Sequence, residues 1–537
     1  MTTPPLPDSA TIPIWQAALV LAPALCTGIA ALAITPERGM AAAWRLARLG
    51  SLLALLFAAV GATAVAFGAS GHFGWLEADR LGATVLLLVA FLGEVIVRYS
   101  RSYMDGQPAE REYVRWLLLT LTGVAVVLTT SHLLLLTLAW TATGLALHRL
   151  LTFFGDRPAA ALAAHKKFLV SRIADLLMLA AIAALDFTFG TLQLDDVLHA
   201  CVTAKELPAG ASFAAVAIAL AALLKCAQLP FHGWLLQVME APTPVSALLH
   251  AGVVNLGGFV LMRFAPLIEA VPAAQALLVV GGGATAVVAA LVTSTRISVK
   301  VMLAWSTCAQ MGFMLMQCGL GAFEMALLHL LAHSLYKAHA FLAAGGVVRQ
   351  TMVRRLAPAA PAPGAIALAF GAAASVGMAA LAARAWGTDL GHEPGLWVLA
   401  TIFALSLLPL LHLRALRLGG AWPAGLLLGA GAAAFAWFGL HELFASWFPP
   451  AHTPPPMVLC WLAGAMFLAL HAVQLVIALW PRSAFVQRLH LWCYGGFYLD
   501  ELCCRVVLRL WPPPRPLLAS TPGPLPASVR FVTETRQ

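Results

Sequence analysis

The sequence predicts an all-α, polytopic membrane protein with about fifteen transmembrane helices, and three observations support this fold class. The chain of 537 residues is 61% hydrophobic and only 10% charged, whereas soluble proteins are about 45 to 50% apolar and about 25% charged. Apolar runs of roughly 18 residues or more, enough to cross a bilayer, recur from residue 12 to residue 480. Lysine and arginine collect in nearly every second break between these runs, as in cytoplasmic loops.

The expected helices follow one another with short connections, at about 20 residues a span. The first run lacks a basic leader and a small-residue cleavage site, so it is read as a retained helix and not as a signal peptide. The expected ranges are 12–35, 41–69, 81–99, 114–130, 132–154, 164–190, 211–240, 243–266, 274–293, 298–319, 322–348, 363–386, 394–415, 421–447 and 456–480.

The distribution of basic residues predicts the orientation of the chain. The loops after odd-numbered helices carry most of the lysines and arginines, and the positive-inside rule places such loops in the cytoplasm. The C-terminus is then cytoplasmic and the N-terminus outside. The basic loop residues are Arg38, Arg45, Arg48, Arg98, Arg101, Arg111, Arg115, Arg157, Lys166, Lys167, Arg296, Arg349, Arg354, Arg355, Arg414, Arg417, Arg482 and Arg488.

Composition also excludes several function classes. The net charge of +9 comes from arginines at the ends of apolar runs and not from a basic stripe with interleaved aromatics, so no nucleic-acid partner is indicated. Nine cysteines form no C-x-x-C pair and no Cys/His cluster with zinc spacing, so we expect no metal site and no cofactor on this chain. There is no phosphate-binding loop and no nucleophile triad, so catalysis on this chain is not expected.

The seventh expected helix, 211–240, contains a proline within its apolar length. Pro230 lacks a backbone N–H and should break the helix near His232. Irregular backbone at membrane depth is tolerated where it lines a cavity; a simple kink packed against neighbouring helices is the alternative. Glu240 follows the break, where its carboxylate could face a cavity or cap the next helix.

Two lysines lie well inside apolar runs, although the chain has only six lysines against twenty-six arginines. A charge at the bilayer centre costs about 2.5 to 3.5 kcal/mol, so Lys225 and Lys337 require a partner or a role. A lysine can release a proton near neutral pH when it is buried, whereas an arginine cannot. The alternative is that each side chain extends to the membrane interface.

Histidines accompany these lysines. His329, His333 and Lys337 are spaced i, i+4, i+8, so a helix presents them on one face, and His250 lies on the eighth expected helix. Histidine titrates near neutrality, so such a row is typical of a proton relay. A single intramembrane histidine is more often a packing residue.

Acidic residues within the apolar segments are the candidate partners of the lysines. Asp175 follows Arg172 by three residues and Glu94 precedes Arg98 by four, so each acid is either part of a local structural pair or a member of the relay. Glu324 enters the eleventh expected helix.

The chain after residue 480 is too polar to span a membrane. It is amphipathic as far as Arg509, which indicates a helix on the cytoplasmic interface or a docking element for a partner, and Tyr498, Asp500 and Glu501 are the candidate docking residues. From Pro512 on it is proline-rich, which is typical of disorder. The whole chain is expected to divide into N-terminal transmembrane helices (1–113), two groups of five helices (114–266 and 267–418), C-terminal transmembrane helices (419–480) and a cytoplasmic segment with a proline-rich tail (481–537).

Several motifs resemble those of the proton-conducting subunits of respiratory complex I and of Mrp antiporters. They are residues 224–234 (LKCAQLPFHGW), 239–250 (MEAPTPVSALLH), 303–307 (LAWST) and 333–338 (HSLYKA). The resemblance implies two inverted five-helix repeats, helices four to eight and nine to thirteen, with a broken helix in each. It also implies that Lys225 is the central lysine of a first half-channel, that His250 is its neighbour, and that His329, His333 and Lys337 connect to the second half.

The sequence departs from complex I subunits in three places. Those proteins have a Trp-Glu pair on helix five whose glutamate partners the central lysine, whereas here Trp140 is followed by Thr141. The lysine expected on the second broken helix, near 375–388, is absent, with only Arg384 nearby. The long lateral helix has no counterpart after residue 480.

Other motifs resemble the DabB family, the membrane subunits of two-component inorganic carbon transporters. They are 98–106 (RYSRSYMDG), 145–151 (LALHRLL), 298–301 (SVKV, with Lys300), 334–342 (SLYKAHAFL) and 496–502 (GFYLDEL). This resemblance implies a DabA-like cytoplasmic zinc protein as partner, so that zinc is expected in the partner. It further implies that a cation gradient energises hydration of CO2 to bicarbonate in that partner.

The leading hypothesis is a membrane subunit that conducts protons or sodium ions through a relay and so drives inorganic carbon accumulation. The alternatives are an antiporter-like subunit of a complex I or Mrp-type complex, and a membrane anchor that transports nothing. The sequence leaves open which ion moves, which acid replaces the missing glutamate, the stoichiometry, and whether the second half conducts. The relay candidates are Lys225, His250, His329, His333, Lys337, Asp175, Glu94 and Lys300.

Overall fold

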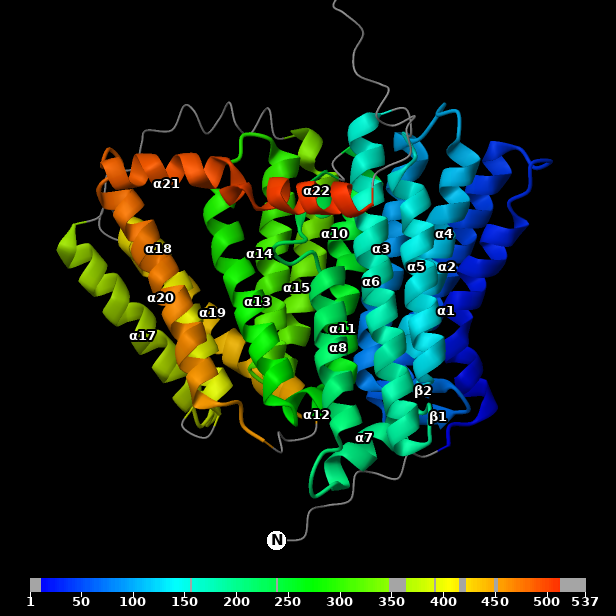
Figure 1. The fold of residues 1–537 in the computed structure, drawn as a ribbon, viewed down its shortest axis with the longest axis horizontal. Helices are drawn as coiled ribbons and strands as arrows, with labels where there is room; N and C mark the ends of the chain where they lie inside the picture. Colours follow the sequence, from blue (N-terminus) through cyan, green and yellow to red (C-terminus); the bar gives the residue numbers. More distant parts are fainter. Residues whose placement is uncertain are drawn as a thin grey trace, which may run out of the picture.

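The computed structural model describes residues 11–154, 157–237, 240–346, 364–390, 393–414, 422–448 and 453–511. Long helices run side by side through a single bundle (Figure 1). Among the described residues, twelve helices are long and apolar enough to cross a membrane. The predicted class, an all-α polytopic membrane protein, is confirmed.

The first half of the chain contains the short hairpin of β1 and β2. The bounds there are α1 (Ile14–Ala33), α2 (Met40–Ala66), β1 (Gly71–Phe73), β2 (Leu76–Ala78), α3 (Arg80–Tyr103), α4 (Glu110–Thr129), α5 (Leu133–Leu151), α6 (Pro158–Phe189), α7 (Leu194–Thr203), α8 (Ala209–Lys225), α9 (Gly233–Gln237), α10 (Thr243–Ala251), η2 (Val253–Asn255), α11 (Leu256–Arg263) and α12 (Ala265–Glu269).

The second half is helical throughout its described part. The bounds are α13 (Pro272–Thr293), α14 (Val299–Gly319), α15 (Phe323–Leu342), η3 (Ala344–Gly346), α17 (Ala365–Trp386), α18 (Pro394–Arg414), α19 (Trp422–Ala445), α20 (Met457–Leu479), α21 (Ala484–Tyr494), η4 (Gly496–Tyr498) and α22 (Leu499–Leu510).

Each of the fifteen expected ranges coincides with a helix or an interrupted helix, but not all of these helices meet the criteria for a span. Three of the expected ranges are not among the twelve candidate membrane spans. One of them holds α8 and α9, the second holds α15 and the third holds α18. The helix α8 stops early at Lys225, and α15 carries several polar and titratable side chains. The total of about fifteen spans therefore stays a prediction.

The predicted break around Pro230 is present in the structure. The helix α8 ends at Lys225 and α9 begins at Gly233. Ala227 adopts a left-handed conformation with φ of 53°, and polar groups satisfy the freed backbone. Gln228 Nε2 donates to the Cys226 carbonyl at 2.7 Å, and the Leu229 N–H donates to the Thr285 hydroxyl oxygen at 3.1 Å.

The second expected break is not found where the resemblance places it. The helix α17 runs without interruption from Ala365 to Trp386. That stretch is rich in alanine, the best helix former, and contains no proline. A second interruption instead follows α10, where the short turn η2 separates it from α11.

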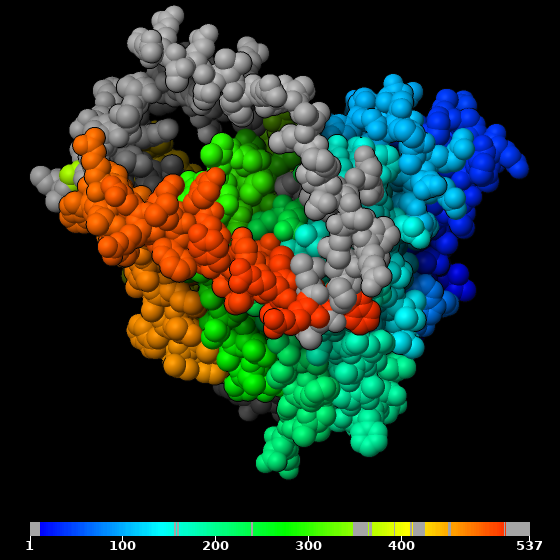
Figure 2. Space-filling model, turned by 45° about the horizontal axis from the view of Figure 1, so that its top comes forward, coloured from blue at the N-terminus to red at the C-terminus, as the bar shows by residue number. Residues whose placement is uncertain are grey.

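The two ends of the bundle differ. The hairpin end carries β1, β2 and α7, whereas the opposite end, here the arm end, carries the C-terminal arm formed by α21, η4 and α22 (Figure 1). The arm crosses the surface as one band (Figure 2). The amphipathic segment predicted after residue 480 therefore lies across the bundle, as two short helices in place of one long lateral helix. The tail from Pro512 on and the basic residues Arg349, Arg354, Arg355 and Arg417 lie outside the described residues.

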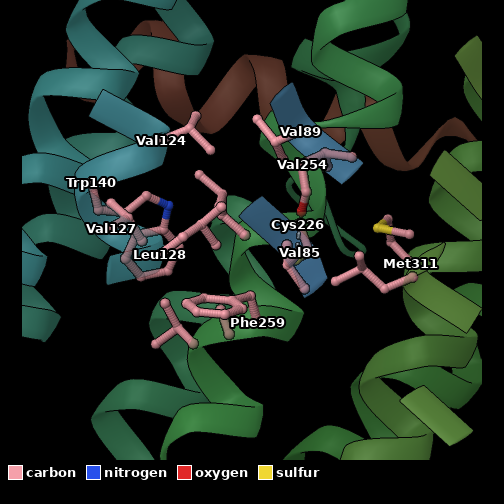
Figure 3. Packing of buried hydrophobic residues seen from close by; sticks show 14 of the residues in the cluster. Val85, Val89, Val124, Val127, Leu128, Trp140, Cys226, Val254, Phe259 and Met311 are labelled. Carbon is pink, nitrogen blue, oxygen red and sulfur yellow. Dashed lines mark hydrogen bonds between the residues drawn. The ribbon is translucent and has the colours of Figure 1, made fainter. Parts of the chain in front are cut away.

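Apolar packing surrounds the break. Figure 3 shows Trp140 of α5 beside Val127 and Leu128 of α4, with Cys226, at the start of the break, close to Val254 of η2. The Cys226 thiol donates to the Val254 carbonyl at 3.2 Å, and the cysteine is completely buried. The break is thus enclosed by side chains and holds Lys225 in the interior.

Candidate functional site

Lys225 is the last residue of α8, and its ammonium group forms a buried ion pair. Lys225 Nζ lies 2.6 Å from Asp175 Oδ1, and both side chains are 9% exposed. Arg172 contacts the other carboxylate oxygen at 2.7 Å. The Trp140 ring lies against the lysine, with its centroid 4.4 Å from Nζ. One carboxylate thus serves two cations, and an aromatic face covers one of them.

A third cation lies in the same pocket. Lys167 of α6 is buried and donates to the Gly144 carbonyl at 2.5 Å. A cavity of about 20 Å³ is lined by Trp140, Lys167, Ser171 and Lys225, among others, which is room for about one water molecule. We call Lys167, Arg172, Asp175 and Lys225 the first cluster.

The sequence interpretation missed the role of Lys167, because it assigned that residue to a cytoplasmic loop together with Lys166. Both lysines are buried, at 4% and 3% exposed, inside α6. The available signal was the spacing of Lys167, Ser171 and Asp175 at i, i+4, i+8, which places them on one helix face.

Lys337 of α15 is held differently. Its side chain is completely buried, and Nζ donates to the Leu303 carbonyl at 3.1 Å and to the Ser306 hydroxyl at 2.8 Å. Over the described ranges, no carboxylate lies within ion-pair distance of this ammonium group. Neutral oxygens of α14 therefore hold the charge.

The structure gathers three histidines around Lys337. The His329 and His333 rings lie 6.0 Å apart, and His250 of α10 stacks on Phe341 at 4.4 Å. His333 interacts electrostatically with His329, His250 and Lys337. Within the described part of the chain, the ring nitrogens of His250 and His333 have no hydrogen-bond partner. These residues and Lys337 form the second cluster.

Other predicted site residues lie apart from both clusters. Glu94 accepts from the Ser51 hydroxyl at 2.5 Å and faces Arg48 at 4.0 Å, so Asp175 and not Glu94 is the acid beside Lys225. Lys300 donates to the Thr243 hydroxyl at 2.9 Å.

The residues predicted at the break differ in burial. His232 is completely buried, with its ring 4.8 Å from that of Trp305 and Nδ1 3.3 Å from the Pro230 carbonyl oxygen. Glu240 pairs with Arg157 at 3.0 Å, and both side chains are about half exposed. Glu240 therefore lies at the surface and not in the cavity.

The predicted docking residues of the arm differ in exposure. Asp500 faces the bundle and pairs with Lys166 at 3.1 Å; its role in docking a partner stays a prediction. A turn at Phe497 and Tyr498, both left-handed, directs Asp500 inward. Tyr498 is 56% exposed and Glu501 is also exposed.

A group that sequence reasoning did not predict lies at the hairpin end. His441 of α19 is 4% exposed in its side chain, and its ring nitrogens lie 3.4 Å from Glu324 Oε1 and 3.7 Å from Glu393 Oε2. Partial burial and the neighbouring acids raise the pKa of Glu393, which precedes α18. Among the described residues, no group of three or more His, Cys, Asp or Glu side chains is arranged to hold a metal ion.

Comparison of the sequence with known proteins identifies its family. Residues 130–383 match the model of the family described as NADH:quinone oxidoreductase/Mrp antiporter, TM. The chain is 42% identical to the "Probable inorganic carbon transporter subunit DabB" of Hydrogenovibrio crunogenus, over 89% of this chain and 92% of that protein. It is 38% identical to the DabB2 subunit of Halothiobacillus neapolitanus, over 81% of this chain and 80% of that protein.

Solved structures show the same fold at lower identity. The chain aligns with a chain of the Mrp complex of Dietzia at a TM-score of 0.56 and 24% identity, covering 93% of this chain and 57% of that one. It aligns with a chain of an archaeal membrane-bound sulfane sulfur reductase at a TM-score of 0.56 and 20% identity, covering 92% and 99%.

Proposed function

The chain belongs to the DabB family of inorganic carbon transporter subunits, and we propose that it conducts protons to energise a cytoplasmic partner that accumulates inorganic carbon. The proposed path comprises the first cluster and the second cluster. The partner is a DabA-like zinc protein, and zinc belongs to that partner. The arm end faces the cytoplasm of a bacterial inner membrane, as the many basic residues there favour.

The observation that carries this proposal is the buried ion pair of Lys225 and Asp175 at the helix break. Breaking an α-helix inside a bilayer and burying charges there are both costly. A purely structural span gains nothing from either feature. A lysine that exchanges its proton with a nearby cavity gives both features a use.

The second cluster supports protons as the transported ion. Histidine nitrogens without hydrogen-bond partners can accept or donate protons, and a row of them can pass a proton along a helix face. Sodium is coordinated by several oxygen atoms, whereas the second cluster offers mainly nitrogen. One elementary charge that crosses 100 mV supplies about 2.3 kcal/mol, which can shift a partner's equilibrium by about fifty-fold.

The test is uptake of radiolabelled bicarbonate in cells that express the chain with its partner. We expect Lys225→Met to abolish accumulation while the complex still assembles, and an uncoupler to abolish accumulation by the native complex. Arg48→Gln, a half-exposed position away from both clusters, serves as the matched control. Normal accumulation by Lys225→Met would refute the proposal.

Two other functions give different outcomes. The family model and the Mrp likeness favour an antiporter-like subunit of a respiratory or Mrp-type complex; that protein would purify with quinone-linked or other antiporter subunits and not with a zinc protein. A membrane anchor that transports nothing would keep its partner active after the uncoupler collapses the gradient.

A further inference from the structure

One carboxylate of the C-terminal arm reaches into the bundle beside the helix break. Lys166 Nζ donates to the two oxygens of Asp500 at 3.1 and 3.2 Å, and Gln237 Nε2 donates to Oδ2 at 3.1 Å. The Lys166 side chain is 4% exposed and that of Asp500 is 21% exposed. The contact therefore joins α6, α9 and α22, which are far apart in the sequence.

The backbone at the start of α9 is shaped for this carboxylate. A Cβ atom on Gly233 would lie 1.4 Å from Asp500 Oδ1. A larger residue at this position would therefore collide with the carboxylate where it now lies. Glycine at this position lets the carboxylate approach the backbone closely. Asp500 also interacts electrostatically with the buried His232, directly before α9.

The segments that Asp500 holds are those that frame the first cluster. Lys166 precedes Lys167, which lines the same cavity as Lys225. The helix α9 follows the break that begins after Lys225. A shift of Asp500 would therefore act on two walls of the cavity, which are formed by Lys167 of α6 and Trp234 of α9.

Other side chains of the arm are exposed. Trp492, Tyr498 and Leu502 are 54%, 56% and 61% exposed. Tryptophan and tyrosine are the residues that most often dominate the binding energy of protein interfaces. The arm thus has a carboxylate that contacts α6 and α9 and exposed side chains that are available to the cytoplasmic partner.

We propose that Asp500 is a positioning residue, which fixes the C-terminal arm against the broken helix and α6 and thereby couples the arm to the first cluster. This inference rests on the proposed function. When the partner displaces the arm, the contacts to Lys166 and Gln237 are lost and the walls of the cavity move. Conversely, a change of charge in the cavity alters how firmly the arm is held, because coupling between two sites is reciprocal.

The experiment compares Asp500→Asn with the native complex and with Arg505→Gln, an exposed charge on the same helix. We expect Asp500→Asn to lower bicarbonate accumulation by about fivefold or more, the lower end for coupled sites. The partner should still co-purify, and proton conduction by the reconstituted chain should persist. Arg505→Gln should match the native protein.

Two further variants separate positioning from general damage. Gly233→Ala should reproduce the defect from the other side of the contact, because its methyl group displaces the carboxylate. The exchange of Lys166→Asp with Asp500→Lys restores the ion pair in reverse and should recover part of the lost accumulation. A defect that this exchange does not relieve, or a loss of partner binding in Asp500→Asn, would overturn the proposal.

Failure of this inference differs from failure of the proposed function. If accumulation by the native complex resists an uncoupler, the proposed function is wrong. If the native complex is sensitive to the uncoupler and Asp500→Asn accumulates bicarbonate normally, only the positioning role is wrong.

Discussion

The first and second clusters each bury a lysine, but they stabilise its charge in different ways. Lys225 has a carboxylate at 2.6 Å and an aromatic ring at 4.4 Å. Lys337 has one carbonyl and one hydroxyl, and the titratable groups around it are histidines and the Cys308 thiol. The first lysine therefore shares a full negative charge with Arg172, whereas dipoles stabilise the second.

This difference sets different conditions for proton exchange at the two clusters. An adjacent carboxylate favours the charged form of a lysine, and neighbouring cations oppose it. In the first cluster, Lys225 and Arg172 contact different oxygens of the same carboxylate of Asp175. Proton exchange at Lys225 therefore depends on how that carboxylate is shared, so a shift of Arg172 relative to Asp175 would change it.

The largest effect is expected when the carboxylate of the first cluster is removed. Asp175→Asn leaves Lys225 and Arg172 without a buried counter-charge, which costs about 3 kcal/mol or more in the free energy of unfolding. Bicarbonate accumulation should fall to the level of cells without the complex. Thermal unfolding in detergent and radiolabelled uptake measure the two effects.

A double variant separates the stability of the first cluster from its function. Asp175→Leu combined with Lys225→Met replaces the closest ion pair by apolar side chains, which is often neutral or stabilising. Only Arg172, whose side chain is partly exposed, then loses its counter-charge. The double variant should therefore unfold at a higher temperature than Asp175→Asn but remain inactive in uptake. Activity in the double variant would show that the pair is only structural.

The next largest effect is expected at the second cluster, where a substitution should abolish accumulation with little change in stability. Lys337→Met loses two hydrogen bonds, but it also removes a buried charge that has no carboxylate beside it among the described residues, and these two effects oppose each other. The free energy of unfolding should therefore change less than in Asp175→Asn. Accumulation should nevertheless be lost. Lys337→Arg keeps the charge but cannot release a proton, and it should be inactive too; full activity of this variant would exclude a relay through Lys337.

Local sequence patterns predicted most of the fold and both lysines. Apolar run length located the helices, Pro230 located the break, and the rarity of lysine singled out Lys225 and Lys337. Each of these signals lies within one helix or one turn, where side-chain chemistry acts on its own backbone. For the same reason, the missing proline left α17 continuous where a resemblance had suggested a break.

Contacts between distant segments were not predictable from these patterns. The choice of Asp175 over Glu94 depends on how α6 packs against α8, and the partner of Lys166 lies 334 residues away at Asp500. His441 and Glu324 meet only because α19 packs against α15. Periodicity shows which face of a helix is polar, but not which other helix that face meets.

A smaller effect should follow from removing the ring over Lys225. Trp140→Leu keeps the site apolar but loses the cation–π contact, worth about 2 kcal/mol at a desolvated site. Accumulation should fall partially, since Asp175 still holds the lysine. Trp116→Leu is the matched control, because Arg149 lies 5.7 Å from that ring with its own side chain exposed. Equal losses of stability in the two variants would contradict this interpretation.

The smallest effect is expected from the hydroxyl group that holds Lys337. Ser306→Ala removes one of the two hydrogen bonds at the second cluster, which is worth about 1.5 kcal/mol for a charged donor. The Leu303 carbonyl still accepts from the lysine, so the chain should fold normally. Accumulation should fall severalfold. The pH at which accumulation is half-maximal should also shift, because the charged form of Lys337 loses one hydrogen bond. Ser294→Ala, whose exposed hydroxyl bonds only the Leu291 carbonyl, should leave both quantities unchanged; an unshifted pH profile in Ser306→Ala would mean that dipoles of α14 do not tune the second cluster.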